Sequence, residues 1–153
     1  MEHASNGIVV GVDGSACSLH ALRWAVREAL ISGAEVTAVL VWSDPWSIVG
    51  PPSMFGAGKA GHARLKGLVA NLVKQAVDEE HAGAVHVEER VVAGHAAETL
   101  VAESAGARLL VVGTTGLSGI RRWILGSVSQ RCAQLSHIPV VIVPLPDGEP
   151  EVA

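Results

Sequence analysis

Apolar and polar positions along the chain follow two patterns: short continuous apolar runs, and stretches in which apolar residues recur every three or four positions. The first pattern is typical of strands buried on both faces, and the second of amphipathic helices. The predicted strands cover residues 7–12, 35–42, 85–92, 109–112 and 140–143. The predicted helices cover residues 16–32, 65–83, 95–105 and 127–135.

Local features refine three of these elements. Ser15 precedes the first helix as a plausible N-cap and Gly33 follows it as a stop. The strand 85–92 alternates apolar and polar residues, so we expect it toward a sheet edge. Val128, Cys132 and the leucine at 135 share one helical face, which we expect to be buried.

Strands that alternate with helices indicate βαβ units, and these favour an open parallel sheet with helices on both faces and right-handed crossovers. We therefore predict a single α/β domain of the Rossmann-like type over 1–153, with its core in 7–144. Residues 43–58 are rich in Pro, Gly and Ser, which predicts a long mobile loop inside the domain. The polar tail 146–153 is expected to fray.

Composition excludes several classes of protein. The 153 residues include 11 basic and 15 acidic ones, and no basic stripe predicts a nucleic-acid surface. The longest apolar run, 36–42, is far shorter than the about 20 residues of a membrane-spanning helix. The N-terminus runs into a strand-like segment, so we expect no signal peptide. The chain has two cysteines, Cys17 and Cys132, far apart in sequence, which form neither a disulfide framework nor a metal-binding spacing and favour a reducing, cytoplasmic setting.

Candidate chemistry follows the predicted strands, because open parallel sheets bind ligands at the carboxyl ends of their strands. Asp13 follows the first strand, and Gly113 and Gly116 follow the fourth. Gly126 and Ser127 then open the last helix, whose unpaired N–H groups suit a phosphate. Two cations between these glycines could screen phosphate charge, namely Arg121 and Arg122.

Each of these residues also has an ordinary structural interpretation. Glycines after strands are often only turn residues, and an aspartate there often shapes the turn before a helix. Ser127 could simply cap its helix, and the two arginines could lie on a solvated loop. The spacing is neither a dinucleotide fingerprint nor a P-loop.

The spacing Gly113-x2-Gly116-x9-Gly126-Ser127 resembles the G-x2-G-x9-G-[ST] motif of the ATP-binding universal stress proteins. Residues 8–15 (IVVGVDGS) are similar to the first strand of that family and its terminal aspartate. Residues 125–144 (LGSVSQRCAQLSHIPVVIVP) are similar to its C-terminal half. One departure is Ala96, where many relatives carry proline.

The resemblance implies a sheet order of 3-2-1-4-5 and a nucleotide site. It places Asp13 near adenine and ribose, with a possible indirect link to Mg²⁺, and a backbone contact to adenine near Val39. It implies that ribose and phosphates are held by Gly113, Gly116, Gly126 and Ser127. It also implies a homodimer through the last strand, 139–144, whose apolar edge would invite an identical partner.

Four functions remain open from the sequence. The first is a cytoplasmic ATP-binding protein with a regulatory role in the stress response. The second is a module for cyclic AMP, AMP or another adenine nucleotide, the third a weak ATPase, and the fourth a dimeric scaffold. No nucleophile–base–orienter set is evident, so we expect no catalytic residue and slow hydrolysis at most. The full glycine set favours the first function.

Overall fold

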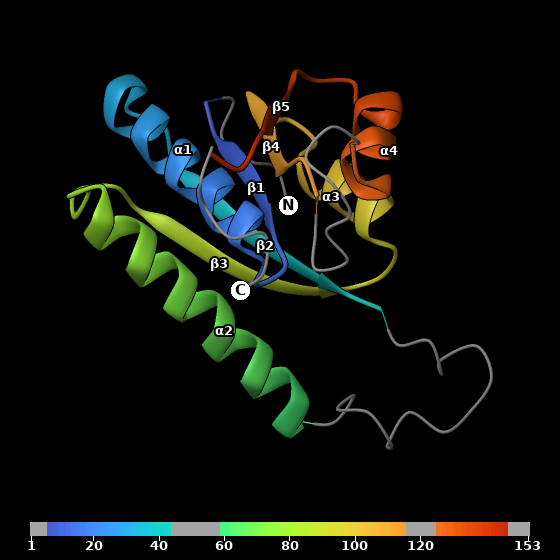
Figure 1. Cartoon of the computed structure of the whole chain (residues 1–153), viewed down its shortest axis with the longest axis horizontal. Helices are drawn as coiled ribbons and strands as arrows, with labels where there is room; N and C mark the ends of the chain where they lie inside the picture. Colours follow the sequence, from blue (N-terminus) through green and yellow to red (C-terminus); the bar gives the residue numbers. More distant parts are fainter. Residues whose placement is uncertain (1–5, 44–58, 116–124, 147–153) are drawn as a thin grey trace.

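The computed structural model describes residues 6–43, 59–115 and 125–146, in which strands and helices alternate (Figure 1). The elements are β1 (Ile8–Val12), α1 (Ala16–Ser32), β2 (Val36–Trp42), α2 (Lys59–Glu79), β3 (Val87–Ala93), α3 (Ala96–Glu103), β4 (Leu109–Gly113), α4 (Ser127–Leu135) and β5 (Val140–Val143). Most of the predicted loop 43–58 and of the tail 146–153 lies outside the described residues.

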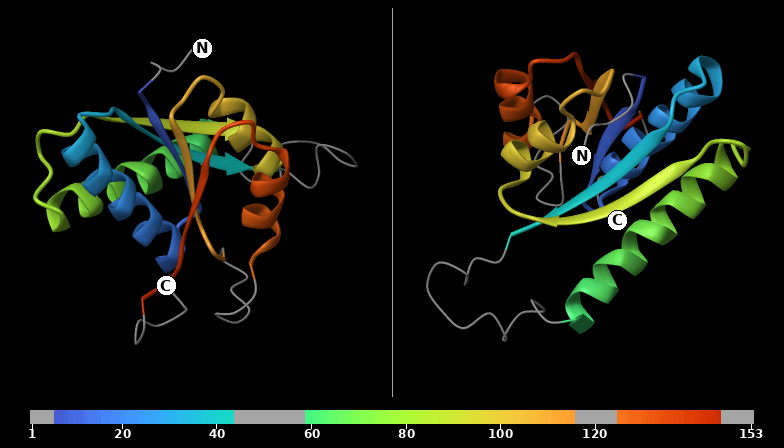
Figure 2. Two further views of the ribbon diagram at one scale, coloured as in Figure 1. Left: turned by 90° about the horizontal axis from the view of Figure 1, so that it is seen from above. Right: turned by 180° about the vertical axis from the view of Figure 1, so that it is seen from behind.

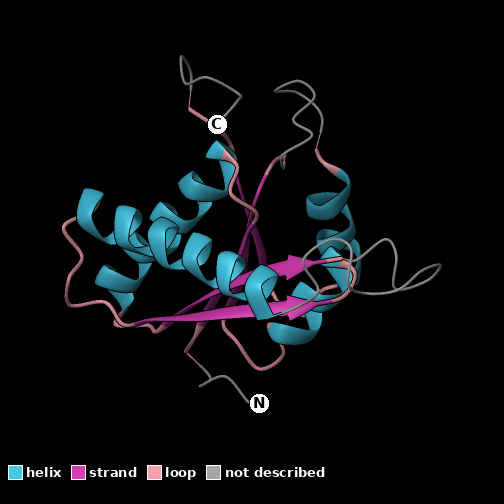
Figure 3. Cartoon of the chain, turned by 90° about the horizontal axis from the view of Figure 1, so that it is seen from below, coloured by secondary structure: helices cyan, strands magenta, loops and turns pink. Residues whose placement is uncertain are grey.

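The strands form one parallel sheet in the order β3-β2-β1-β4-β5. Helices α1 and α2 cover one face of this sheet, and α3 and α4 cover the other (Figures 2 and 3). The fold class and the strand order expected from the sequence are confirmed, as is the position of β3 at a sheet edge. None of the described helices is both long and apolar enough to cross a membrane.

The central strands are almost wholly apolar because each contributes side chains to two cores. In β1, the side chain of Val10 packs with α1 and α2, whereas that of Val9 packs with α3 and α4. Both side chains are fully buried. Burying one such side chain stabilises the fold by roughly 1.5–3 kcal/mol, so the two-sided burial accounts for the short continuous runs.

Helix α1 begins and ends where its capping residues predict. The Oγ atom of Ser15 accepts a hydrogen bond of 3.1 Å from the N–H of Ser18. At the other end, Gly33 adopts the left-handed conformation and donates its N–H to the carbonyl of Ala29. Both predicted caps are therefore confirmed.

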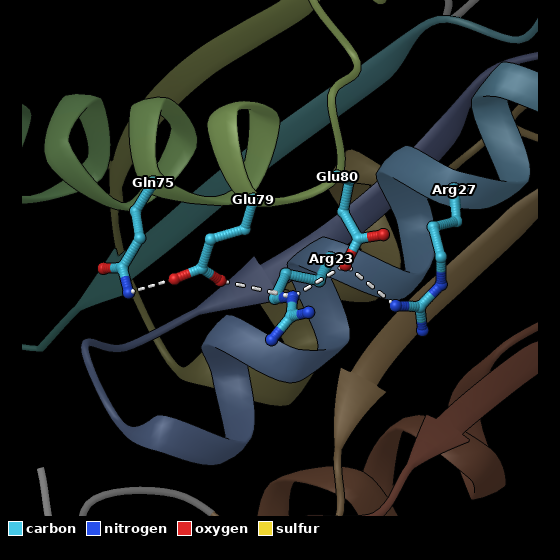
Figure 4. Close-up of polar contacts among 5 residues, drawn as sticks. All are labelled: Arg23, Arg27, Gln75, Glu79 and Glu80. Carbon is cyan, nitrogen blue, oxygen red and sulfur yellow. Dashed lines mark hydrogen bonds and ion pairs between the residues drawn. The ribbon is translucent and has the colours of Figure 1, made fainter.

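Helices α1 and α2 are joined by a small ionic cluster (Figure 4). Glu80 accepts from Arg23 at 2.7 Å and from Arg27 at 2.9 Å. Glu79 lies 3.3 Å from Arg23 and accepts from Gln75. Fully exposed ion pairs contribute about 0.2–1 kcal/mol each, and Glu80, whose side chain is only 10% exposed, is better shielded from water than such pairs. The cluster fixes how the end of α2 lies against α1.

The buried face of α4 differs from the prediction. Val128 is exposed, whereas Ser129 is buried together with Cys132. The helix is therefore rotated relative to the expected apolar face. This rotation is tolerated because the buried Ser129 hydroxyl has acceptors in the carbonyl of Thr114, just beyond β4, and in that of Gly126, at the N-cap of α4.

Candidate nucleotide site at the ends of β1 and β4

The candidate site lies where β1 and β4 end side by side. These parallel strands are neighbours, and Val10 pairs with Val111. The chain leaves β1 toward β2 on one side, and β4 leads to β5 on the other, so the strand order reverses between them. Open α/β sheets bind their ligands at such a reversal. Asp13 and Thr114 are the first residues beyond the two strands.

Asp13 is built into the turn that begins α1. Its Oδ1 atom accepts the N–H of Ser15 at 2.9 Å, and its own N–H lies 3.3 Å from the Oγ atom of Ser18. Gly14 between them has φ +89°, a conformation that favours glycine. The aspartate thus shapes the turn, as its structural interpretation proposed, and its carboxylate is held at the positive end of the α1 dipole.

Gly113 is required by the close approach of α1 to β4. A Cβ atom on Gly113 would lie 2.8 Å from the Sγ atom of Cys17 and 3.0 Å from its carbonyl oxygen. The absence of a side chain therefore allows the first turn of α1 to lie against the end of β4. This packing role is independent of any ligand.

Thr114 joins three parts of the site. Its N–H donates to the carbonyl of Val143 in β5, at 3.2 Å. Its own carbonyl accepts the N–H of Gly126 at 2.6 Å and the hydroxyl of Ser129 at 3.0 Å. Its Oγ1 atom lies 3.3 Å from the thiol of Cys17. The starts of α1 and α4 and the end of β5 therefore meet at one residue.

Gly126 occupies the N-cap position of α4, and Ser127 is the first helical residue. The capping role considered for Ser127 is therefore wrong. A Cβ atom on Gly126 would lie 3.1 Å from the carbonyl oxygen of Thr114, so this glycine too permits a close approach. The exposed Ser127 stands at a helix start, where backbone N–H groups lack partners within the helix.

The other predicted site residues fall elsewhere. Val39 lies in the middle of β2, opposite Gly11, and its fully buried side chain packs with α3 and α4. Its neighbours in the sheet are β1 and β3, and β2 continues to Trp42. Gly116, Arg121 and Arg122 lie outside the described residues.

A metal at this site would depend on Asp13 and on its ligand. Within the described ranges, no three His, Cys, Asp or Glu side chains gather closely enough to hold an ion. Mg²⁺ commonly binds through one or two carboxylates together with substrate phosphates. Asp13, at the end of β1, is a carboxylate of the kind that this arrangement uses.

Sequence reasoning missed the two residues that hold the site together, Thr114 and Ser129. Thr114 acts largely through its backbone N–H and carbonyl groups, which have no sequence pattern of their own. Ser129 could have been noticed as a polar residue three positions before Cys132 on a short helix, but spacing alone does not identify its partner.

The comparison with protein families matches residues 6–144 to the model described as the universal stress protein family. Universal stress protein MJ0531 of Methanocaldococcus jannaschii is 33% identical over 150 residues, covering 97% of this chain and 87% of that protein. Universal stress protein Rv2623 of Mycobacterium tuberculosis is 36% identical, and the chain spans 48% of its length. The chain thus spans about half the length of that mycobacterial relative.

Solved structures share the fold. A universal stress protein in complex with cAMP has a TM-score of 0.68 and 33% identity, with 92% of this chain and 98% of that chain covered. A universal stress protein of Lactobacillus plantarum, UspA, has a TM-score of 0.69 at 21% identity, with 93% and 99% covered. At that identity the second likeness shows the fold alone.

Proposed function

Because the chain belongs to the universal stress protein family, we propose that it binds an adenine nucleotide, foremost ATP, where β1 and β4 end. In this proposal nucleotide occupancy regulates a cytoplasmic stress response, and hydrolysis is slow or absent. The residues proposed to hold the nucleotide are Asp13, a backbone group near Val39, Gly113, Gly116, Gly126 and Ser127, with Mg²⁺ bound through the phosphates and Asp13.

The observation that carries the proposal is the convergence of two helix starts on Thr114. Cys17 in the first turn of α1 contacts the Thr114 side chain, and Gly126 at the start of α4 bonds its carbonyl. Each helix directs the positive end of its dipole toward its N-terminus. At α1 this end is already met by the Asp13 carboxylate and the Ser15 hydroxyl, which accept the N–H groups of Ser15 and Ser18, so α1 offers a carboxylate for a metal. The start of α4, where backbone N–H groups lack partners within the helix, suits an anionic phosphate chain.

The cAMP complex of a protein 33% identical to this chain supports an adenine nucleotide as the ligand class. We favour ATP over cyclic AMP because the whole glycine motif, including Gly116 and Ser127, is present in the sequence. Cyclic AMP, which has one phosphate, would use less of that motif.

We further propose that two copies pair through β5. Its residues Val140, Val141 and Ile142 are only half-buried in the single chain, and β5 is a sheet edge. An apolar edge strand offers unpaired backbone groups to an identical strand. At the opposite edge, β3 carries the exposed charged residues Glu88 and Glu89, which discourage such pairing.

The direct test is calorimetric titration of Mg-ATP, AMP and cyclic AMP into nucleotide-free protein. Ser127→Ala is the informative variant, because an exposed residue at the first helical position should not disturb the fold. We expect it to weaken ATP binding by about tenfold, the equivalent of about 1.4 kcal/mol. Gln130→Ala, exposed one turn further along α4, is the matched control and should bind normally. If neither ATP, AMP nor cyclic AMP binds the wild-type protein, the proposal fails and a dimeric scaffold becomes the better account.

A further inference from the structure

Ser129 is a buried hydroxyl with two carbonyl neighbours. Ser129 is 2% exposed, and its Oγ atom lies 3.0 Å from the carbonyl oxygens of both Thr114 and Gly126. A hydroxyl carries one proton, so a single donor is shared between the end of β4 and the cap of α4. The side chain thus ties the helix start to the strand it follows.

The fold does not need this hydroxyl to satisfy its backbone. The Thr114 carbonyl also accepts the N–H of Gly126, and the Gly126 carbonyl also accepts the N–H of Gln130 at 3.0 Å. Removing the hydroxyl therefore leaves neither carbonyl without a donor. It removes only the side-chain link between the end of β4 and the start of α4. We therefore expect the loss of the hydroxyl to change the geometry of this junction more than the stability of the fold.

We propose that Ser129 is a positioning residue for nucleotide binding, acting through Thr114 and Gly126 without touching the nucleotide. This inference rests on the proposed function. The Gly126 N–H and the Ser129 hydroxyl converge on one acceptor from successive parts of the first turn of α4, so together they fix the direction of that turn relative to β4. The free N–H groups of this first turn are then held in a fixed direction toward the phosphates.

Ser129 should affect the binding of some ligands more than that of others. A ligand that carries phosphates uses the first turn of α4, whereas adenosine, which lacks them, does not. Ser129 should therefore influence the preference for ATP over adenosine and leave binding of the nucleoside itself unchanged. If Ser129 only supported the fold, its loss would weaken the binding of ATP and of adenosine to the same degree.

The test compares affinities for ATP and adenosine by competition and calorimetry, with thermal melting to verify folding. Ser129→Ala is expected to weaken ATP binding by about tenfold and to change adenosine binding by less than about twofold. The near-isosteric pair Ser129→Thr and Ser129→Val separates shape from hydrogen bonding: Thr should keep the wild-type preference and Val should lose it. The matched control is Ser104→Ala, since Ser104 is another buried serine, whose hydroxyl donates to the carbonyl of Val101 in α3.

An unchanged ATP-to-adenosine ratio in Ser129→Ala would overturn the inference, as would an equal loss in Ser104→Ala. If Ser129→Thr and Ser129→Val both fail to fold, the comparison of the two alanine variants decides alone. A wild-type protein that binds no adenine nucleotide overturns the proposed function instead, so the two failures are told apart by the wild-type titration.

Discussion

The thiol of Cys17 lies 3.3 Å from the Oγ1 atom of Thr114, although the two residues are 97 positions apart in the sequence. The same thiol lies 3.6 Å from the carbonyl oxygen of Val143, to which it donates. One small side chain at the start of α1 therefore touches the ends of both β4 and β5. This contact explains why the residue before Thr114 has no side chain.

Gly113→Ala should destabilise the protein by about 1–3 kcal/mol, the usual cost of overpacking. The new Cβ atom would meet the backbone carbonyl of Cys17 as well as its thiol, so side-chain movement alone cannot relieve the clash. Urea denaturation measures the change. Gly67→Ala is the control: Gly67 lies within α2, its Cβ would meet nothing within 4 Å, and alanine should stabilise the helix by up to about 1 kcal/mol. Equal stability of Gly113→Ala and wild type would refute this account of Gly113.

Asp13→Asn should keep the fold and remove the effect of Mg²⁺ on ATP binding. An asparagine oxygen can still accept the Ser15 N–H, but it lacks the negative charge that attracts a cation. Titrations of ATP with Mg²⁺ and with a chelator measure the effect. We expect the wild type to bind more weakly without the metal and the variant to bind equally in both. A variant as metal-dependent as the wild type would remove Asp13 from any role at the metal.

Cys132 should make stability fall with pH in alkaline solution. Burial, and to a lesser degree the charge of Glu98, raises the pKa of this thiol to about 11 from its ordinary value of 9.0. Between these two values the unfolded chain releases a proton that the folded protein keeps, so the free energy of unfolding decreases as pH rises. The contribution is complete below pH 9.0 and is lost toward about 11.

Denaturation of wild type and Cys132→Ala across this range isolates the effect of that thiol. The alanine variant will be less stable throughout because it leaves a cavity, but its pH slope should be shallower, by at most about one proton. Identical slopes would mean that the thiol titrates alike in the folded and unfolded states.

Ile142→Pro should convert a dimer into a monomer. Bonds to β4 use the carbonyls of Pro139 and Val143, so by the alternation of a strand the N–H of Ile142 points outward. Proline removes this outward donor without breaking the β4–β5 ladder. Light scattering of both proteins measures the mass, and Val141→Pro, which removes a donor facing β4, should instead destabilise the fold. A monomeric wild type would contradict pairing through β5.

The fold was predictable from the sequence because its determinants are local. Each strand is marked by its own apolar run. The cap at Ser15 and the stop at Gly33 form hydrogen bonds to residues only three or four positions away. The buried face of α4 was not predictable, because the choice between Val128 and Ser129 depends on a carbonyl supplied by Thr114, fifteen positions from that serine. The same limit applies to Gly113, whose constraint comes from Cys17.

The contrast between the two sheet edges bears on how far any assembly can grow. If β5 strands pair in a twofold arrangement, the combined sheet presents a β3 strand at each of its ends. There, Glu88 and Glu89 expose charge, and Arg90 is occupied by Glu88 and Glu103. Such ends repel further strands. Assembly would therefore stop at two copies. A chain in which only one edge strand, β5, can pair would thus be protected from forming fibres.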